Sequence, residues 1–150
     1  MGRREYSYSR DMTFHINRRG YGKDIPATDI DFVEYDNLEP VLIWEAKSDK
    51  SHWKQGRRTA SMIVQWKIAQ RANIKYRVIE NSDNWSVIRS YKILGWDRMR
   101  PKVEQVGVYT LPEFIQALYK IRGREIPSWV NVPDELEPIS FDAAPQLSLI

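Results

Sequence analysis

The sequence predicts a single α/β domain with a mixed central sheet flanked by helices. Residues 27–49 have the pattern of two strands joined by a turn, and residues 74–93 have the pattern of a second strand pair. A long helical segment at about 52–72 separates the two pairs. This order of elements favours one layered α/β core. We expect the domain to span residues 1–124 and to be followed by an acidic, proline-containing tail at 125–150.

Composition limits the chemistry that this chain can perform. It has no cysteine and two histidines, which excludes a disulfide framework, a thiolate site and a histidine-rich metal site. Five acids and no Lys or Arg lie in the tail, so residues 1–124 hold 23 basic and 15 acidic side chains, a net charge of +8. A basic body indicates a polyanionic partner. We expect a soluble cytoplasmic protein without membrane contact, because no apolar run of membrane-spanning length occurs.

The first strand pair carries an unusual concentration of charge. Residues 41–44 (VLIW) form a continuous apolar run, which is typical of a strand buried on both faces. Because strand side chains alternate, Glu45 and Lys47 share the face of Ile43 at the end of this strand. A carboxylate and an ammonium at the end of a core strand are costly to bury for structure alone.

The preceding strand is predicted to bring further acids to the same place. Asp29 and Asp31 share one of its faces, and residues 36–40 provide the turn into the apolar strand. If the pair is antiparallel, an acid of the first strand approaches Glu45 and Lys47. Two carboxylates and a lysine at a sheet edge suit a hard cation and a water molecule to be activated.

The acid, the hairpin and the sequence Glu45-Ala46-Lys47 resemble the core motif of the PD-(D/E)XK nuclease superfamily. Asp31 precedes Glu45 by fourteen residues, and residues 30–33 (IDFV) resemble the Ile-Asp-hydrophobic-hydrophobic form of the motif; the proline often found before the acid is replaced by Ile30. The resemblance covers roughly residues 27–95.

This resemblance implies a restriction-endonuclease-like fold and a metal-dependent phosphodiester hydrolase. It implies that Asp31, Glu45 and the carbonyl of Ala46, with Asp29 as an accessory ligand, hold one or two Mg²⁺ (or Mn²⁺) ions. Lys47 would orient the attacking water and stabilise the transition state. The implied products are a 5′-phosphate and a 3′-hydroxyl.

Basic segments on both sides of the motif are candidates for DNA contact. The predicted helix begins after Ser51 as N-cap, with Gly56 weakening its first turns so that the regular part is expected from about Arg57. It carries no acid as far as Ala72. Its expected apolar side comprises Ala60, Ile63, Val64, Trp66, Ile68 and Ala69. Its expected polar side comprises Lys54, Gln55, Arg57, Arg58, Gln65, Lys67, Gln70 and Arg71, of which the first four are the DNA-binding candidates. A merely solvated helix face is the alternative.

The basic, aromatic segment 1–22 offers a second DNA contact, with Arg18 and Arg19 as candidates for phosphate binding. The alternative is a solvated arm that packs its aromatic side chains on the core. Residues 95–106 are predicted to form a basic surface connection. A second helix is predicted to begin at Thr110 as N-cap, with Pro112 in its first turn, and to end at Gly123.

The last five residues resemble a peptide that binds the bacterial sliding clamp, whose pattern is Gln-Leu-(Ser/Asp)-Leu-Phe. Gln146 would supply hydrogen bonds, and Leu147, Leu149 and Ile150 would fill a pocket, with Ile150 replacing the usual phenylalanine. An apolar segment that docks on its own domain is the alternative.

Together these features predict a metal-dependent DNA endonuclease that is selective for DNA structure and acts in replication, recombination or repair. A Holliday-junction resolvase and a restriction-type enzyme are the nearest variants, and a homodimer is expected. Two alternatives remain: a non-catalytic DNA-binding or clamp-docking adaptor, and a purely structural ion-pair cluster formed by the acids and Lys47.

Overall fold

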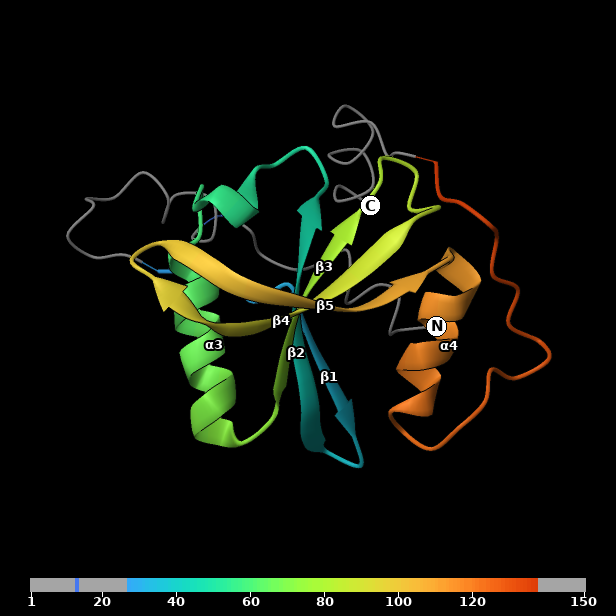
Figure 1. Ribbon diagram of the computed structural model, residues 1–150. Helices are drawn as coiled ribbons and strands as arrows, with labels where there is room; N and C mark the ends of the chain where they lie inside the picture. The colour runs from blue at the N-terminus through green and yellow to red at the C-terminus, as the bar shows by residue number, and fades with distance from the viewer. Residues whose placement is uncertain (1–12, 14–26, 138–150) are drawn as a thin grey trace. The chain divides into compact units, whose positions relative to one another are not determined.

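The computed structural model describes residue 13 and residues 27–137, and one compact unit, Thr28–Leu136, contains the strands and helices below (Figure 1). In this part of the chain no helix is both long enough and apolar enough to cross a membrane. The elements are β1 (Phe32–Asp36), β2 (Glu39–Ser48), the 3₁₀ helix η1 (Trp53–Gln55), α3 (Ala60–Ala72), β3 (Lys75–Asn81), β4 (Ile88–Asp97), β5 (Arg100–Tyr109) and α4 (Leu111–Lys120).

The five strands form one mixed sheet in the order β1-β2-β3-β4-β5. β2 and β3 are parallel and are connected through α3, whereas the other neighbouring pairs are antiparallel. The helices α3 and α4 lie on opposite faces of the sheet (Figure 1). The α/β class and the mixed sheet flanked by helices are therefore confirmed.

The apolar run in β2 builds both halves of the core. Ile43 packs in a cluster with Met62 and Ala69 of α3, while Trp44 packs on the other face with Leu111 and Phe114 of α4. Strand alternation sends successive side chains to opposite faces, so one buried strand supplies two clusters. The predicted division of β2 into two faces is confirmed.

The hairpin of β1 and β2 is antiparallel as predicted, but β1 is shorter than expected. Phe32 lies opposite Trp44, and their rings stack at a centroid distance of 4.1 Å. Asn37 and Leu38 make the tight turn with φ angles of 51° and 68°. Because β1 begins at Phe32, Asp31 immediately precedes the strand, and the prediction that the acids lie within it is wrong.

The long helix predicted from residue 52 is also wrong in its first two turns. The helix α3 begins at Ala60, and residues 52–59 form η1 and an irregular turn. Left-handed φ angles at His52 (57°), Gly56 (94°) and Arg58 (55°) interrupt any helix there. The turn places Trp53 in the core, with 1% of its surface exposed. Thr59 rather than Ser51 precedes the helix.

The buried face of α3 differs from the predicted one. Met62, Gln65 and Ala69 are buried, whereas Val64 and Ile68 are exposed. Part of this difference follows from the late start of α3. The predicted first turns made one side of the helix look uniformly basic, but those residues do not belong to α3. The end of α3 is as predicted, with Asn73 in the left-handed conformation that commonly terminates helices.

The predicted surface connection at 95–106 is wrong: these residues form the part of a long β4–β5 hairpin that includes its tip. Trp96 and Val103 pack against the cluster on the α3 side, while alternate residues of the edge strand face solvent. An edge strand with an exposed face tolerates charged residues, so its composition resembles that of a loop.

The predicted start of α4 is confirmed, but the helix ends at Lys120 rather than at Gly123. Thr110 accepts a hydrogen bond from the backbone N–H of Glu113, whose side chain accepts from the N–H of Thr110, and a proline occupies the first turn. This reciprocal capping box fixes the start of the helix. Beyond α4, Val132 packs on the Trp44 cluster, and the N–H of Leu136 donates to the carbonyl of Asn84.

Candidate active site

The structure brings Asp31, Glu45 and Lys47 together at the carboxyl end of β2. The Lys47 Nζ lies 3.5 Å from Glu45 Oε2, and both side chains are largely buried. The hairpin returns Asp31 to the same point, where its Oδ2 accepts a hydrogen bond of 3.0 Å from the backbone N–H of Ala46. The carboxylates of Asp31 and Glu45 and the ammonium of Lys47 therefore lie around Ala46.

Glu45 is held in an environment that disfavours its charge. Burial is the largest cause that raises its pKa, and the nearby Asp31 carboxylate adds to this effect. The Lys47 ammonium and the Gln65 amide lower the pKa of Glu45, but by less than the first two causes raise it. In addition, Glu45 Oε1 is buried and has no hydrogen-bond partner among the described residues. Such an oxygen is costly unless a ligand satisfies it.

A buried glutamine, which the sequence reasoning assigned to the exposed side of the helix, supports this site. Gln65 has 0% of its surface exposed. Its Nε2 donates to the carbonyl of Asp29 at 2.8 Å, and its Oε1 accepts from the Tyr76 hydroxyl at 3.0 Å. The pKa of Tyr76 is raised by burial first and by the carboxylates of Glu45 and Asp31 second, so the hydroxyl keeps its proton and donates.

This glutamine had a recognisable signal in the sequence. Met62, Gln65 and Ala69 follow the i, i+3, i+7 spacing of a buried helical stripe. A polar side chain within such a stripe must find buried partners. Gln65 finds them in the segment that leads to Asp31 and in β3, and it therefore fixes α3 against the acidic side of the site.

The basic residues predicted to bind DNA divide into two groups. Arg57 and Arg58 are exposed, as is Gln55, and the carbonyl of Arg58 lies 3.5 Å from Lys47 Nζ. Lys54, in contrast, is engaged within the protein. Its Nζ donates to the Tyr91 hydroxyl at 2.7 Å.

Lys54 also contacts a buried acid that the sequence reasoning missed. Its Nζ lies 3.7 Å from Glu80 Oε2, which accepts a second contact of 2.9 Å from the Trp53 indole N–H. Glu80 pairs in register with Lys47 across β2 and β3, so it lies on the same face as the candidate site. These contacts anchor the turn before α3 beside Lys47. The sequence signal for Glu80 was its place as the acidic residue that ends the predicted strand 74–80.

The donor set fits a hard divalent cation. The described residues contain no group of three or more His, Cys, Asp or Glu side chains that could hold a metal, so Asp29 does not complete such a group with Asp31 and Glu45. The predicted set needs two carboxylates and a backbone carbonyl. Asp31 and Glu45 provide the carboxylates, and Glu45 Oε1 accepts no hydrogen bond of normal geometry from the described residues.

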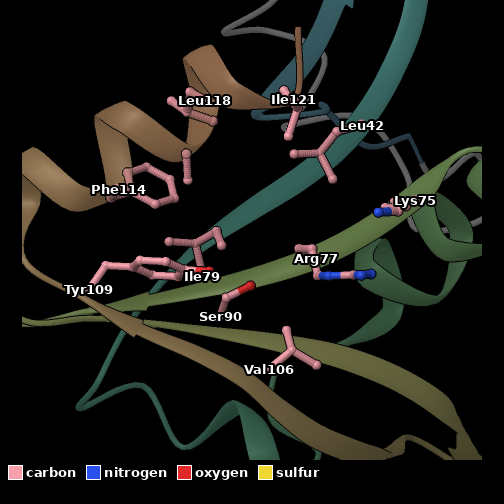
Figure 2. Close-up of a pocket in the computed structure, with 11 residues that line it drawn as sticks. Leu42, Lys75, Arg77, Ile79, Ser90, Val106, Tyr109, Phe114, Leu118 and Ile121 are labelled. Atoms are coloured by element: carbon pink, nitrogen blue, oxygen red, sulfur yellow. The ribbon is translucent and has the colours of Figure 1, made fainter. Parts of the chain in front are cut away.

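A cavity on the opposite face lacks these groups. It has a volume of about 260 Å³ and lies between the sheet and α4 (Figure 2). Its walls are apolar side chains such as Phe114 and Leu118, and its charged groups are the cations of Lys75 and Arg77. Its lining contains no carboxylate, so it offers no side-chain ligand of the predicted metal site. The predicted metal ligands therefore lie on the other face of the sheet, with Glu45.

The remaining predicted contacts lie outside the described residues. These are Arg18 and Arg19 in the basic N-terminal segment, and Gln146, Leu147, Leu149 and Ile150 in the clamp-like peptide. Comparisons of this chain with family models, with curated proteins and with solved structures found no match.

Proposed function

We propose that this protein is a metal-dependent deoxyribonuclease with a restriction-endonuclease-like core of the PD-(D/E)XK type. One observation carries the proposal. Asp31, Glu45 and Lys47 meet at the end of one strand pair, and a buried oxygen of Glu45 has no protein partner among the described residues. A purely structural ion-pair cluster would be expected to satisfy that oxygen.

Asp31, Glu45 and the carbonyl of Ala46 would hold Mg²⁺ or Mn²⁺ in this proposal. A bound metal of this kind lowers the pKa of a water molecule and neutralises charge on the scissile phosphate. The protein prepares the site for a cation by placing two carboxylates where burial and mutual repulsion raise the pKa of Glu45. A bound cation would offset both the cost of burying the Glu45 charge and its repulsion by Asp31.

Lys47 is the group proposed to orient the attacking water and to stabilise the charge that develops on the phosphate. Its ammonium is held between Glu45 Oε2 and the carbonyl of Arg58, at 3.5 Å from each. Gln65 supports the acidic side of the site through the Asp29 carbonyl. The site is thus fixed by β2, the turn before α3 and α3 itself, which limits its reorganisation during a reaction.

The biological setting of the proposal follows from charge and from the terminal peptide. Salt-sensitive, sequence-independent contact with DNA would select substrates by structure, as in replication, recombination or repair. Residues 146–150 would dock the enzyme on a sliding clamp, and a homodimer would act on two strands. These points extend the proposal and are tested separately from the chemistry.

The test is a nuclease assay on single-stranded, duplex, flapped and four-way-junction DNA, with Mg²⁺ or Mn²⁺ compared with EDTA. We expect metal-dependent cleavage that Lys47→Ala reduces by at least a hundredfold. Lys50→Ala is the matched control, because Lys50 is an exposed lysine three residues away that pairs with Asp83. A chain lacking residues 146–150 should cleave free DNA normally and lose any stimulation by the clamp.

Two outcomes would contradict the proposal. DNA binding without cleavage under every metal would favour the non-catalytic adaptor. Unchanged function in Lys47→Met, together with greater stability, would favour the structural ion-pair cluster, because a well-packed apolar side chain often replaces a buried charge favourably.

A further inference from the structure

The turn before α3 and the tip of the β4–β5 hairpin are in direct contact. Thr59 Oγ1 donates a hydrogen bond of 2.6 Å to the carbonyl of Met99 at the hairpin tip. A Cβ atom added to Gly56 would lie 3.2 Å from the same carbonyl oxygen, which is a tight contact, and the φ of 94° at this position also favours glycine. The hairpin tip and the turn lie beside each other at the start of α3 (Figure 1).

This contact connects the hairpin to the candidate active site. Thr59 is fully buried, and its neighbour Arg58 presents its backbone carbonyl to Lys47 Nζ. A short path of packed and hydrogen-bonded groups therefore runs from Lys47 through the turn to Met99. The hairpin tip at Arg98 and Met99 therefore lies beside the turn and the proposed reaction centre, and Arg100 and Lys102 follow it on the exposed face of the edge strand.

These two segments carry an excess of uncompensated positive charge. Within residues 56–59 and 97–102 the only acid is Asp97, whereas the exposed cations are Arg57, Arg58, Arg98, Arg100 and Lys102. None of these five cations forms an ion pair with another described residue. Lysines close to the turn behave differently, because Lys50 pairs with Asp83 and Lys54 with Glu80. The two segments thus keep their cations available to an external anion.

Both turns use arginine at a position that favours glycine or asparagine. Arg58 has a φ of 55° and Arg98 a φ of 57°. A side chain with a Cβ is disfavoured in this left-handed region, so each arginine is retained at a conformational cost. Strained backbone of this kind points to a function of the side chain when it occurs beside a candidate site.

We propose that the turn 56–59 and the hairpin tip 97–102 together bind the phosphate backbone of double-stranded DNA beside the scissile phosphate. This inference rests on the proposed nuclease function and specifies its substrate. Arginine forks contact phosphate oxygens without reading sequence. Single strands are usually held by aromatic stacking, but no exposed Trp, Tyr or Phe lies on either segment. Trp53 is directed into the core, and Trp96 meets Trp66 edge to face.

The test compares the binding of the full chain to a labelled duplex and to its separated strand, by fluorescence anisotropy in EDTA at several salt concentrations. The variant Arg98→Asn/Arg100→Gln removes two cations, and asparagine tolerates the left-handed conformation at 98. The control Lys67→Gln/Arg71→Gln removes two exposed cations from α3. Arg98→Lys/Arg100→Lys keeps the charge, and circular dichroism checks the fold of each variant.

We expect the hairpin variant to bind duplex about tenfold more weakly, with the slope of log K against log salt reduced by about 1.8 for two lost phosphate contacts. The α3 control and the lysine variant should stay within about threefold of the wild type, and wild-type binding should favour duplex over single strand. Two results would overturn this inference if the wild type also cleaves duplex with Mg²⁺: unchanged binding by the hairpin variant, or a preference of the wild type for single strands. Either result would leave the proposed function standing. A wild type that neither binds nor cleaves any DNA would overturn both.

Discussion

At the scale of single residues, burial makes the ionisation of Glu45 unfavourable. Its raised pKa means that, between its unfolded and folded pKa values, the folded state binds more protons than the unfolded state. The free energy of unfolding therefore falls as pH rises through this window and stays lower above it. The window begins near 4.5, the ordinary value for this carboxyl.

The variant Glu45→Gln should remove this contribution to the pH dependence of the free energy of unfolding. We expect it to match the wild type in stability near pH 4 and to become more stable than the wild type as pH rises, in the presence of EDTA. A tenfold change in proton affinity corresponds to about 1.4 kcal/mol, which sets the scale of the difference. Urea denaturation at pH 4 to 8 measures it. The exposed Glu104→Gln is the control, and parallel curves for wild type and Glu45→Gln would refute the assignment.

Gln65 gives a second prediction at this scale. Gln65→Leu keeps the size of the side chain but removes the hydrogen bonds that Gln65 makes with the Asp29 carbonyl and the Tyr76 hydroxyl. We expect a loss of about 1–3 kcal/mol in the free energy of unfolding. Gln70→Leu changes an exposed glutamine of the same helix and should stay within about 0.5 kcal/mol.

A further variant tests the cause of that loss. Tyr76→Phe removes the hydroxyl, so Gln65→Leu should cost less when it is made in this background. Equal costs in both backgrounds would show that the Gln65–Tyr76 hydrogen bond contributes little. Chemical denaturation of all four chains closes the cycle.

At the scale of elements, sequence patterns correctly predicted the helix ends that depend on contacts between neighbouring residues. Thr110, Pro112 and the apolar spacing that follows them specify α4, because a capping box satisfies the free N–H groups of the first turn. Asn73 similarly marked the end of α3. The start of α3 was not predictable in this way. Gly56 signals a break in the first turns, but Arg58, the left-handed residue just before the observed start, carries no such signal.

The capping box at α4 supplies a prediction for this scale. Thr110→Ala should lower the free energy of unfolding by about 1 kcal/mol, because the N–H of Glu113 loses its acceptor. Thr110→Ser retains a hydroxyl and should restore most of the stability. Thermal and urea unfolding of the three chains would measure this, and equal stability of Ala and Ser variants would argue against a contribution from the cap.

At the scale of the whole molecule, the paired carboxylates predict that metal binding stabilises the fold. Mg²⁺ at a hundred times its dissociation constant should raise the free energy of unfolding by about 2.7 kcal/mol. The increase should be visible as a higher melting temperature by calorimetry and should reverse with EDTA. Asp31→Asn/Glu45→Gln should show no increase, and an equal increase in this variant would place the metal elsewhere.

The candidate site was predicted in part because its core is contiguous in sequence. Glu45 and Lys47 stand two residues apart on one strand, so alternation alone places them together. Asp31 joins them through a short hairpin, whose register follows from the turn. Gln65 and Glu80 reach the same region from α3 and β3. Local patterns mark Gln65 as part of a buried stripe and Glu80 as the end of a strand, but they do not place either side chain beside Glu45.

The sequence by itself determined the α/β class, the two faces of β2, the acidic hairpin and the α4 cap, since these depend on side-chain periodicity and on contacts a few residues apart. Tertiary structure decided the break before α3, the β4–β5 hairpin, the burial of Gln65 and the pairing of Lys54 with Glu80. These features depend on free energies summed over residues distant in sequence. Trp53 illustrates the reason, because burying its ring and bonding its indole to Glu80 outweighs the continuation of a helix that the local sequence would favour.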